Sequence, residues 1–414
     1  MEAKNNGIEA YSTPTEDMVV VISAVACGAR EKVGGRLLFE RALIECKRIG
    51  LKKIFVVETG DQAGSSILEE SDLPTSHQII RFRGNIARDV YRAGVVKDKF
   101  ILIDGSYLID PRLLKFLISS QPPCYFPGQL SGEVALGYFT KMELETWATH
   151  CPEAVLASSV ELALSDIDKY NPEIRGEQEP YLVKVSSKRD AARATWTLIT
   201  RNQKKVMDLP SMYIDPPFEN TLTFALCYTP VTPNQVTIFN LIIAFIVGCL
   251  FWTGHFVAGA FLTYAAEILD GVDGKLARAK IIFSKLGEYE CYVDFLYEHW
   301  WYIAITVGLR HQGYGSAVWW AWGILAVSDI WDNILYTMSE HWYGKSLDLL
   351  TPFDSAFRKI AGRRNIYALI FLIGFLLGYP FATFWVAAVW GLITASIHTY
   401  RFARYRMLNP VTVT

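Results

Sequence analysis

The segment from 236 to 253, VTIFNLIIAFIVGCLFWT, runs for 18 residues without a charged side chain. A helix of about 20 apolar residues is long enough to cross the hydrocarbon core of a bilayer. Charge is distributed accordingly, because residues 230–414 hold 13 Lys or Arg and 12 Asp or Glu, whereas residues 1–229 hold 27 and 30. The contrast predicts an aqueous first part and a lipid-embedded second part, and the apolar content excludes a disordered chain.

Five more apolar segments follow the first one along the chain. We therefore expect six membrane helices, at 236–253, 256–278, 289–309, 314–337, 365–379 and 381–403. Lys and Arg gather after the second, fourth and sixth segments, and the other connections hold only Arg310. By the positive-inside rule this alternation places both termini and the basic connections in the cytoplasm. A soluble helix bundle is the alternative, although its helices would not leave whole faces uncharged.

Residues 206–232 precede the first apolar segment as a juxtamembrane stretch. Thr232, Pro233 and Gln235 have the pattern of a capping box, which predicts that a helix begins here. Residues 216–228 mix Phe and Leu with polar residues and fit either an interfacial helix or a simple linker. The seven cysteines include no pair with CxxC spacing, so we expect reduced thiols and neither disulfides nor a zinc site.

Acidic side chains cluster at the cytoplasmic ends of the second and third segments. Asp270 and Asp273 are three residues apart and share a helix face, and Gly274 leaves room for a ligand. A face of the third segment carries, at spacings of four, Glu290, Asp294 and Glu298. Because like charges cannot stay together unpaired in a low dielectric, we expect hard divalent cations here, which can clamp a displacement at phosphorus. The alternative is a set of salt bridges to Lys275, Arg278 and Lys285.

At these residues the sequence resembles the CDP-alcohol phosphotransferases, whose signature is D-x2-D-G-x2-A-R-x8-G-x3-D-x3-D. The matching residues are Asp270, Asp273, Gly274, Ala277, Arg278 and Gly287. The resemblance covers about residues 205–405 and includes the Thr-Pro-Asn-Gln start of the first helix. It implies an integral membrane enzyme, commonly a homodimer, that transfers a substituted phosphoryl group from a CDP-linked donor to an alcohol acceptor and releases CMP.

The sequence departs from the signature after Gly287, because Cys291 and Phe295 stand at the positions of the third and fourth Asp. Glu290 and Asp294 keep the four-residue spacing one position earlier, which we interpret as a one-residue deletion. A second register uses Asp294 and Glu298. The departure leaves a further hypothesis open, that of a catalytically inactive membrane scaffold or binding protein.

The resemblance also implies roles for individual residues. Two Mg²⁺ or Mn²⁺ ions would be held by Asp270, Asp273, Glu290 and Asp294. The general base that takes the proton of the acceptor would be Asp294. The CDP site would include Asp270, Gly274, Ala277, Arg278 and Gly287. A phosphate on the acceptor would be held by Lys285, by the loop residues Arg358, Lys359, Arg363 and Arg364, or by Arg401 and Arg404. Anchoring to acidic lipid explains these basic loops better, however.

The first half of the chain alternates strand and helix patterns. Met18–Val25 is a continuous apolar run, which is typical of a buried parallel strand. Further strands are expected at 53–57, 79–82, 100–103 and 181–185, and helices at 36–48, 85–93 and 111–119. The alternation predicts a doubly wound α/β domain over 17–205, followed by an all-α six-helix transmembrane domain over 233–406.

Three segments of this half resemble sugar-phosphate nucleotidyltransferases, at Gly34–Arg41, Leu51–Val57 and Phe100–Ser106. The phosphate-binding loop of that family is cut here to residues 27–32, and its metal-binding Asp would fall near Ser106, two residues after Asp104. The two domains together are similar to bifunctional proteins that make CDP-inositol and then join it to inositol phosphate. We expect the first domain to be either a regulatory, oligomerising or donor-presenting remnant or an active cytidylyltransferase. No nucleic-acid partner is expected.

Overall fold

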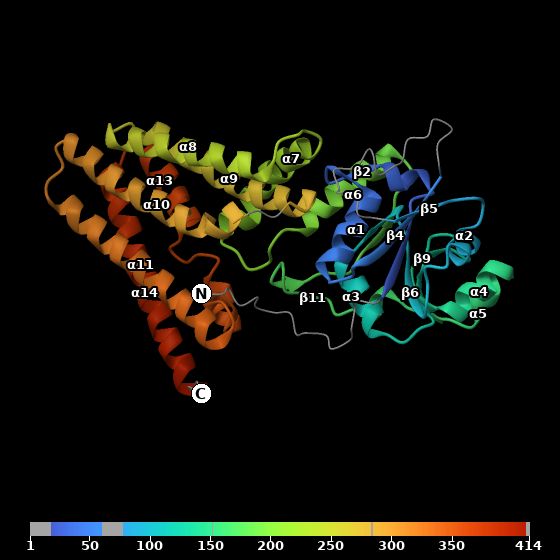
Figure 1. Ribbon diagram of the computed structural model, residues 1–414. Helices are drawn as coiled ribbons and strands as arrows, with labels where there is room; N and C mark the ends of the chain where they lie inside the picture. Colours follow the sequence, from blue (N-terminus) through green and yellow to red (C-terminus); the bar gives the residue numbers. More distant parts are fainter. Residues whose placement is uncertain (1–17, 60–77, 151, 283–284, 411–414) are drawn as a thin grey trace.

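The computed structural model describes residues 18–59, 78–150, 152–282 and 285–410, and at 78, 152 and 285–291 it describes the backbone alone. Two parts lie side by side in Figure 1, an α/β part from the first half of the chain and a group of long helices from the second half. The change in charge content near residue 230 therefore coincides with a change of architecture.

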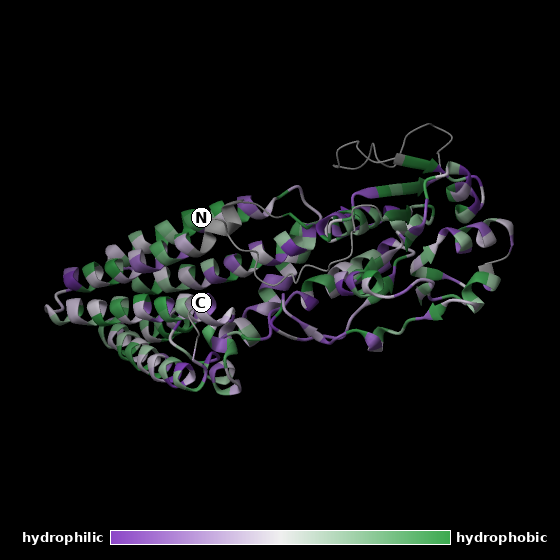
Figure 2. Cartoon of the chain, turned by 60° about the horizontal axis from the view of Figure 1, so that its bottom comes forward, coloured by the Kyte–Doolittle hydropathy of each residue, from purple (hydrophilic) through white to green (hydrophobic). Residues whose placement is uncertain are grey.

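Each of the six predicted apolar segments forms a helix. They are α8 (Pro233–Trp252), α9 (Phe256–Lys280), α10 (Lys285–His311), α11 (Ala317–Tyr343), α13 (Arg364–Leu376) and α14 (Pro380–Leu408). In Figure 2 hydrophobic residues run along most of their length. Within the described ranges only α8 and α14 are long and apolar enough to cross a membrane by length and composition, and α13 is apolar but shorter. Six crossings are thus not confirmed, since α9, α10 and α11 carry carboxylates such as Asp270, Asp294 and Asp329 within their length.

The start of α8 is the predicted capping box. The Thr232 side chain accepts a hydrogen bond from the Gln235 N–H (3.4 Å), and the Gln235 side chain accepts one from the Thr232 N–H (2.9 Å). The juxtamembrane stretch before it contains a helix, α7 (Pro216–Cys227). Its buried Glu219, Asn220 and Thr223 show that α7 packs inside the protein, where it contacts α9, and is not a simple linker.

The α/β part is built on a seven-stranded mixed sheet in the order β10-β8-β9-β6-β1-β4-β5. Neighbours β6, β1, β4 and β5 are parallel, and β9 runs antiparallel to both β6 and β8. The strands are β1 (Val19–Ser23), β4 (Lys53–Glu58), β5 (Gln78–Arg81), β6 (Lys99–Asp104), β8 (Cys124–Pro127), β9 (Val134–Thr140) and β10 (Val160–Glu161). The predicted parallel arrangement holds for β6, β1, β4 and β5, whereas the strands β9, β8 and β10 beyond β6 were not predicted.

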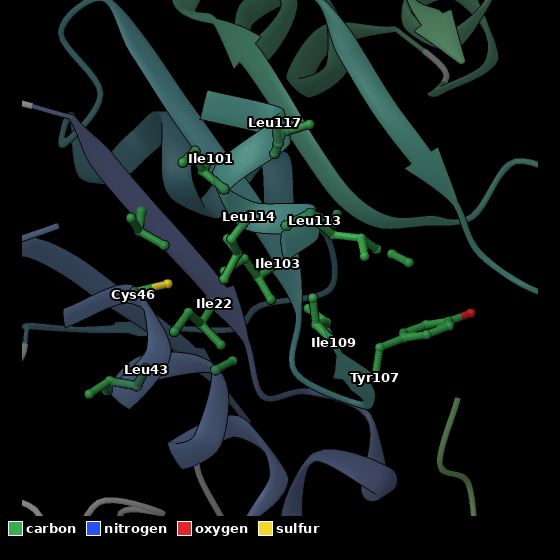
Figure 3. Close-up of a cluster of buried hydrophobic side chains, with 14 of the residues drawn as sticks. Ile22, Leu43, Cys46, Ile101, Ile103, Tyr107, Ile109, Leu113, Leu114 and Leu117 are labelled. Atoms are coloured by element: carbon green, nitrogen blue, oxygen red, sulfur yellow. The ribbon is translucent and has the colours of Figure 1, made fainter. Parts of the chain in front are cut away.

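Both faces of this sheet are covered, as in a doubly wound fold. Successive side chains of a strand point to opposite faces, so Val20 and Ile22 of β1 belong to one core and Val19 and Val21 to the other. Figure 3 shows the first core, where β1 and β6 meet Leu43 of α1 (Leu38–Arg48) and the leucines of α3 (Pro111–Ser119). The second core lies under α2 (Ile86–Ala93) and α4 (Lys141–Thr149).

One predicted strand lies outside this sheet. The 181–185 pattern forms β13 (Leu182–Lys184), which pairs antiparallel with β7 (Tyr107–Ile109) in a ribbon of two strands. The reason is the turn at Gly105, which ends β6 and sends β7 away from the sheet.

The two parts are joined by a continuous apolar contact. Val33, Leu38 and Leu198 of the α/β part pack with Val272 and Leu276 of α9. Beside them, Arg36 donates to the carbonyl of Lys280 (2.5 Å) and Arg41 donates to that of Ala279. Because the last carbonyls of a helix have no partner within the helix, these arginines complete the C-terminal end of α9.

Two glycines make this contact close. Gly34 and Gly35 have positive φ angles of 60° and 84°, a conformation that side chains with a Cβ rarely adopt. A Cβ at Gly34 would lie 2.5 Å from the Ala279 carbonyl oxygen, and one at Gly35 would lie 2.6 Å from that of Cys227. The pair therefore lets the backbone of the α/β part touch the helices.

Candidate active site

A cavity of about 480 Å³ opens where the long helices meet the α/β part. Its walls come from α9, α10, α11 and α13, and from residues 202–211, which connect α6 (Lys188–Arg201) to α7. The lining is rich in charge and includes predicted site residues, namely Asp270, Asp273, Gly274, Arg278, Asp294 and Arg358. The structure thus brings together the acidic positions of the second and third predicted segments.

On α9 the carboxylates occupy one face, as their spacing predicts. Asp270 is partly exposed to the cavity, and Asp273 is buried and accepts a hydrogen bond from Thr237 of α8 (2.7 Å). Glu267 lies one turn deeper, with one carboxylate oxygen buried and without a hydrogen-bond partner. Sequence reasoning did not include Glu267, although it stands three residues before Asp270 on the same face.

On α10 the described carboxylates are Asp294 and Glu298, one turn apart. Both line the cavity. The side chains of Gly287, Lys285 and Glu290 lie outside the described residues, so their predicted roles in CDP, phosphate and metal binding remain predictions.

The positive charge at the centre of these carboxylates belongs to Arg364, the first residue of α13. Its guanidinium lies 2.9 Å from Asp294, 2.8 Å from Glu267 and 3.6 Å from Glu298, and it also donates to Asp270. In this structure Arg364 therefore contacts carboxylates inside the cavity, and its roles as a lipid anchor or acceptor-phosphate residue stay predictions. A cation at a helix N-terminus is opposed by the helix dipole, and this feature was a signal that Arg364 needs carboxylate partners.

Two of the other predicted phosphate-binding arginines are also paired. Arg358 lines the cavity and contacts Asp208 (3.2 Å) and Asp348 (3.5 Å). Arg401 is not among the residues that line the cavity and pairs with Asp354 (2.9 Å). Both arginines therefore form internal ion pairs in this structure.

The two glycines of the α9 motif differ in their surroundings. A Cβ at Gly271 would lie 2.0 Å from a carboxylate oxygen of Glu219, which is itself bound to Lys275 (2.6 Å). A Cβ at Gly274 would meet nothing closer than the Arg278 guanidinium, at 3.5 Å. Gly271 is therefore needed for packing, whereas Gly274 keeps the cavity open. Ala277 is not among the lining residues.

The carboxylate oxygens are the type of ligand that a divalent metal prefers, but the positions of the described carboxylates do not form a metal site. Asp270, Asp273 and Asp294 present hard oxygen donors to one cavity, which is the chemistry that Mg²⁺ prefers. Among the described residues, however, no three His, Cys, Asp or Glu side chains are placed around one point. Arg364 lies between Asp270 and Asp294, so a metal at these two carboxylates would require the guanidinium to share or release them.

The α/β part has a second cavity, of about 320 Å³, at the ends of β1 and β6. Its described lining includes Asp104 and Glu133 but no Lys or Arg. The shortened loop beside it is folded on itself, because the Ala29 N–H donates to Ala26 and the Glu31 N–H to Gly28. Burial raises the pKa of the Asp104 carboxyl. Among the described residues the nearby cation is Lys184, which is already paired with Glu133 (2.5 Å).

Comparison with known families assigns the helical part. Residues 230–395 match the family model described as CDP-alcohol phosphatidyltransferase. The C-terminal part of the chain is a domain of this family. The match contains α9, α10, α11 and α13, and it leaves α7 and the α/β part outside.

Similarity to solved structures is weaker. The phosphatidylinositol phosphate synthase PgsA1 of Mycobacterium tuberculosis, crystallised with CDP-DAG, is 19% identical, with 46% of this chain and 93% of that chain covered and a TM-score of 0.36. HddC of Yersinia pseudotuberculosis, complexed with GMP-PN, is 14% identical, with 44% and 99% covered and a TM-score of 0.30. No curated protein sequence matches significantly. The assignment therefore rests on the family match.

Proposed function

We propose that the chain is a multi-pass membrane CDP-alcohol phosphotransferase whose active site is the 480 Å³ cavity. One observation carries the proposal. Four residues of the family signature, from Asp270 to Arg278, line the same cavity as Asp294, inside the segment that matches the family. The proposed reaction transfers a substituted phosphoryl group from a CDP-linked donor to an alcohol, with both termini and the site on the cytoplasmic side.

The residues of the cavity fit the parts of this reaction. The acceptor hydroxyl oxygen forms a bond to the β-phosphorus of the donor, and the bond from that phosphorus to the CMP oxygen breaks. Asp294 accepts the hydroxyl proton as general base, and Arg364, in contact with it, holds its carboxylate in place. Arg278 lies at the cavity wall, where its charge stabilises the diphosphate. Gly274 leaves the space that the donor needs.

We also propose that two Mg²⁺ or Mn²⁺ ions act here, held by Asp270, Asp273, Glu290 and Asp294. When bound, they supply neutralisation of the diphosphate charge. The donor chemistry of the described carboxylates supports this, although their present partner is Arg364. Chelation of divalent ions should then abolish release of CMP, and added Mg²⁺ or Mn²⁺ should restore it.

The experiment uses the purified full chain in detergent with a series of labelled CDP-linked lipids and polyols. Release of CMP in the presence of an alcohol acceptor, and its loss in Asp294→Asn, would support the proposal. Glu340→Gln is the matched control, because Glu340 is an exposed carboxylate of α11 outside the cavity. Absence of CMP release with every donor, from a protein that melts cooperatively, would refute the enzymatic function.

A second function is favoured by a specific contact. Because Arg364 neutralises Asp270 and Asp294 from within the chain, the site could bind a CDP-linked lipid without turning it over. Such a binding protein or scaffold would retain CDP affinity but release no CMP. For the α/β part we propose a remnant over an active cytidylyltransferase, since the 320 Å³ cavity at the ends of β1 and β6 lacks basic lining residues among those described. Release of pyrophosphate from CTP and a polyol phosphate would overturn this.

A further inference from the structure

One wall of the cavity does not come from the family domain. Residues 202–208, which leave α6 of the α/β part, contribute Asn202, Gln203, Lys204, Met207 and Asp208 to the lining. A loop of the same part adds Arg175. All of these residues precede position 230, where the family match begins. The cavity is thus shared between the two parts of the chain.

The connector is held at both of its ends. Near its start the Lys205 N–H donates to the Ile174 carbonyl (2.8 Å), within the α/β part. Near its end Asp208 pairs with Arg358, and the Leu209 N–H donates to the Lys359 carbonyl (2.8 Å), within the helical part. Because backbone and ion-pair contacts fix it on both sides, the position of Lys204 at the cavity is determined by the fold.

Lys204 is distinguished by its lack of a partner. Other cations of the cavity are compensated, as with Lys275 by Glu219 (2.6 Å) and Arg358 by Asp208 (3.2 Å). In the described part of the chain no side chain forms a hydrogen bond or ion pair with Lys204. Its charged neighbours are the guanidinium groups of Arg278, Arg175 and Arg358 and the carboxylate of Asp270. Desolvation and the three arginines lower the pKa of Lys204, and Asp270 opposes them.

A partly desolvated lysine that lies near two arginines and has no side chain bound to it is unfavourable unless an anion joins it. Arg175 is only weakly compensated, since its carboxylate partner Asp348 lies 3.7 Å away and is shared with Arg358. We propose that Lys204, Arg175 and Arg278 bind a phosphate group of a substrate, so that the α/β part supplies a specificity-determining lysine to the family domain. This inference rests on the proposed function for the identity of the substrate.

Two sources of phosphate share this chemistry. One is the diphosphate of the CDP-linked donor, because Arg278 belongs to the motif implied to bind it. The other is a phosphate carried by the acceptor, which would make the acceptor a polyol phosphate and not an uncharged alcohol. A lysine can bind either of these phosphates, because its ammonium is a compact point charge with three hydrogen-bond donors. The structure therefore supports phosphate binding, and binding assays distinguish the donor from the acceptor.

The experiment measures binding to the full chain in detergent, by calorimetry, for CDP, glycerol 3-phosphate and inorganic phosphate. The variant is Lys204→Gln. Its matched control is Lys205→Gln, which removes the same charge one residue away, outside the cavity lining. Removal of one charge-assisted hydrogen bond predicts affinity weaker by about tenfold or more in Lys204→Gln and unchanged in Lys205→Gln. Lys204→Arg should retain most of the affinity.

Each outcome decides the inference. Weaker binding of CDP alone assigns Lys204 to the donor, and weaker binding of glycerol 3-phosphate alone assigns it to the acceptor. Unchanged binding of both, or an effect on inorganic phosphate only, overturns the inference. A chain that binds CDP through Lys204 but never releases CMP would refute the proposed enzyme and leave the inference standing. If Lys204→Gln releases CMP as well as the parent chain does, the proposed enzyme is supported and the inference about Lys204 is refuted.

Discussion

Arg364 offers the sharpest test of how the cavity is held together, through the substitution Arg364→Met. Methionine keeps much of the apolar stem and removes the guanidinium, which is 15% exposed and contacts four carboxylates. Breaking a buried ion pair by removing one partner costs about 3–5 kcal/mol, because the remaining charge is left without compensation. We therefore expect a loss of stability of this size in the absence of divalent ions.

The free-energy cost of removing the Arg364 guanidinium is not the same at each of the four carboxylates. Glu267 is 2% exposed and Glu298 is 13% exposed, whereas Asp270 and Asp294 are 24% and 23% exposed. Water in the cavity can compensate the two aspartates, so most of the cost arises at Glu267, whose second oxygen already lacks a hydrogen bond. Arg364→Met combined with Glu267→Gln should consequently recover a large part of the lost stability.

The assay is thermal unfolding in detergent with EDTA, followed by tryptophan fluorescence. For a unit of about this size each kcal/mol changes the Tm by about 2–4 °C, so Arg364→Met should melt about 6–20 °C below the parent chain. Arg404→Met, at an exposed position of α14, controls for loss of charge. If the uncovered carboxylates bind Mg²⁺, an excess of about 100 times Kd should return about 2.7 kcal/mol. A Tm within about 2 °C of the parent chain in EDTA would refute the reasoning.

Three further predictions test the packing, the charge and the junction of the two parts. Gly271→Ala forces a Cβ against Glu219 and should destabilise the fold by about 1–3 kcal/mol, whereas Gly274→Ala should melt normally but bind CDP more weakly. Because the pKa of Lys204 is lowered, its positive charge is lost earlier as pH rises, so CDP affinity should fall through that pKa and Lys204→Gln should lack this step. Arg41→Met leaves carbonyls of α9 and Val33 without their donor, which should lower the Tm and expose the junction to limited proteolysis.

Local signals in the sequence predicted the helices of this protein well. Uncharged runs and the Thr232 capping box defined the long helices because both act over a few residues. The crossing count was less predictable, since a helix such as α9 is apolar at one end and carries Asp270 and Asp273 at the other. In the α/β part, β9 was missed because VALGYFT contains a glycine and lacks the alternation of apolar and polar residues.

The grouping of the acidic residues was predictable, whereas the pairing of Arg364 with them and the presence of Lys204 were not. Asp270, Asp273 and Asp294 follow from helix periodicity, because residues three or four apart share a face. Their counter-ion, Arg364, comes from a helix 70 residues beyond Asp294, and Lys204 comes from the other domain. Such contacts depend on how helices and domains pack, which no local pattern records.

Gly34 and Gly35 bear on the function that can be inferred for the α/β domain. In the nucleotidyltransferase resemblance these residues belong to a segment next to a phosphate loop. Here the same segment is pressed against the end of α9, on the helix that carries Asp270 and Arg278. The presence of Gly34 and Gly35 in a sequence therefore does not by itself indicate that the domain still binds a nucleotide. The same two glycines also allow close packing between the two domains. A search for active cytidylyltransferases by this motif would therefore also find proteins in which the glycines serve only the domain contact.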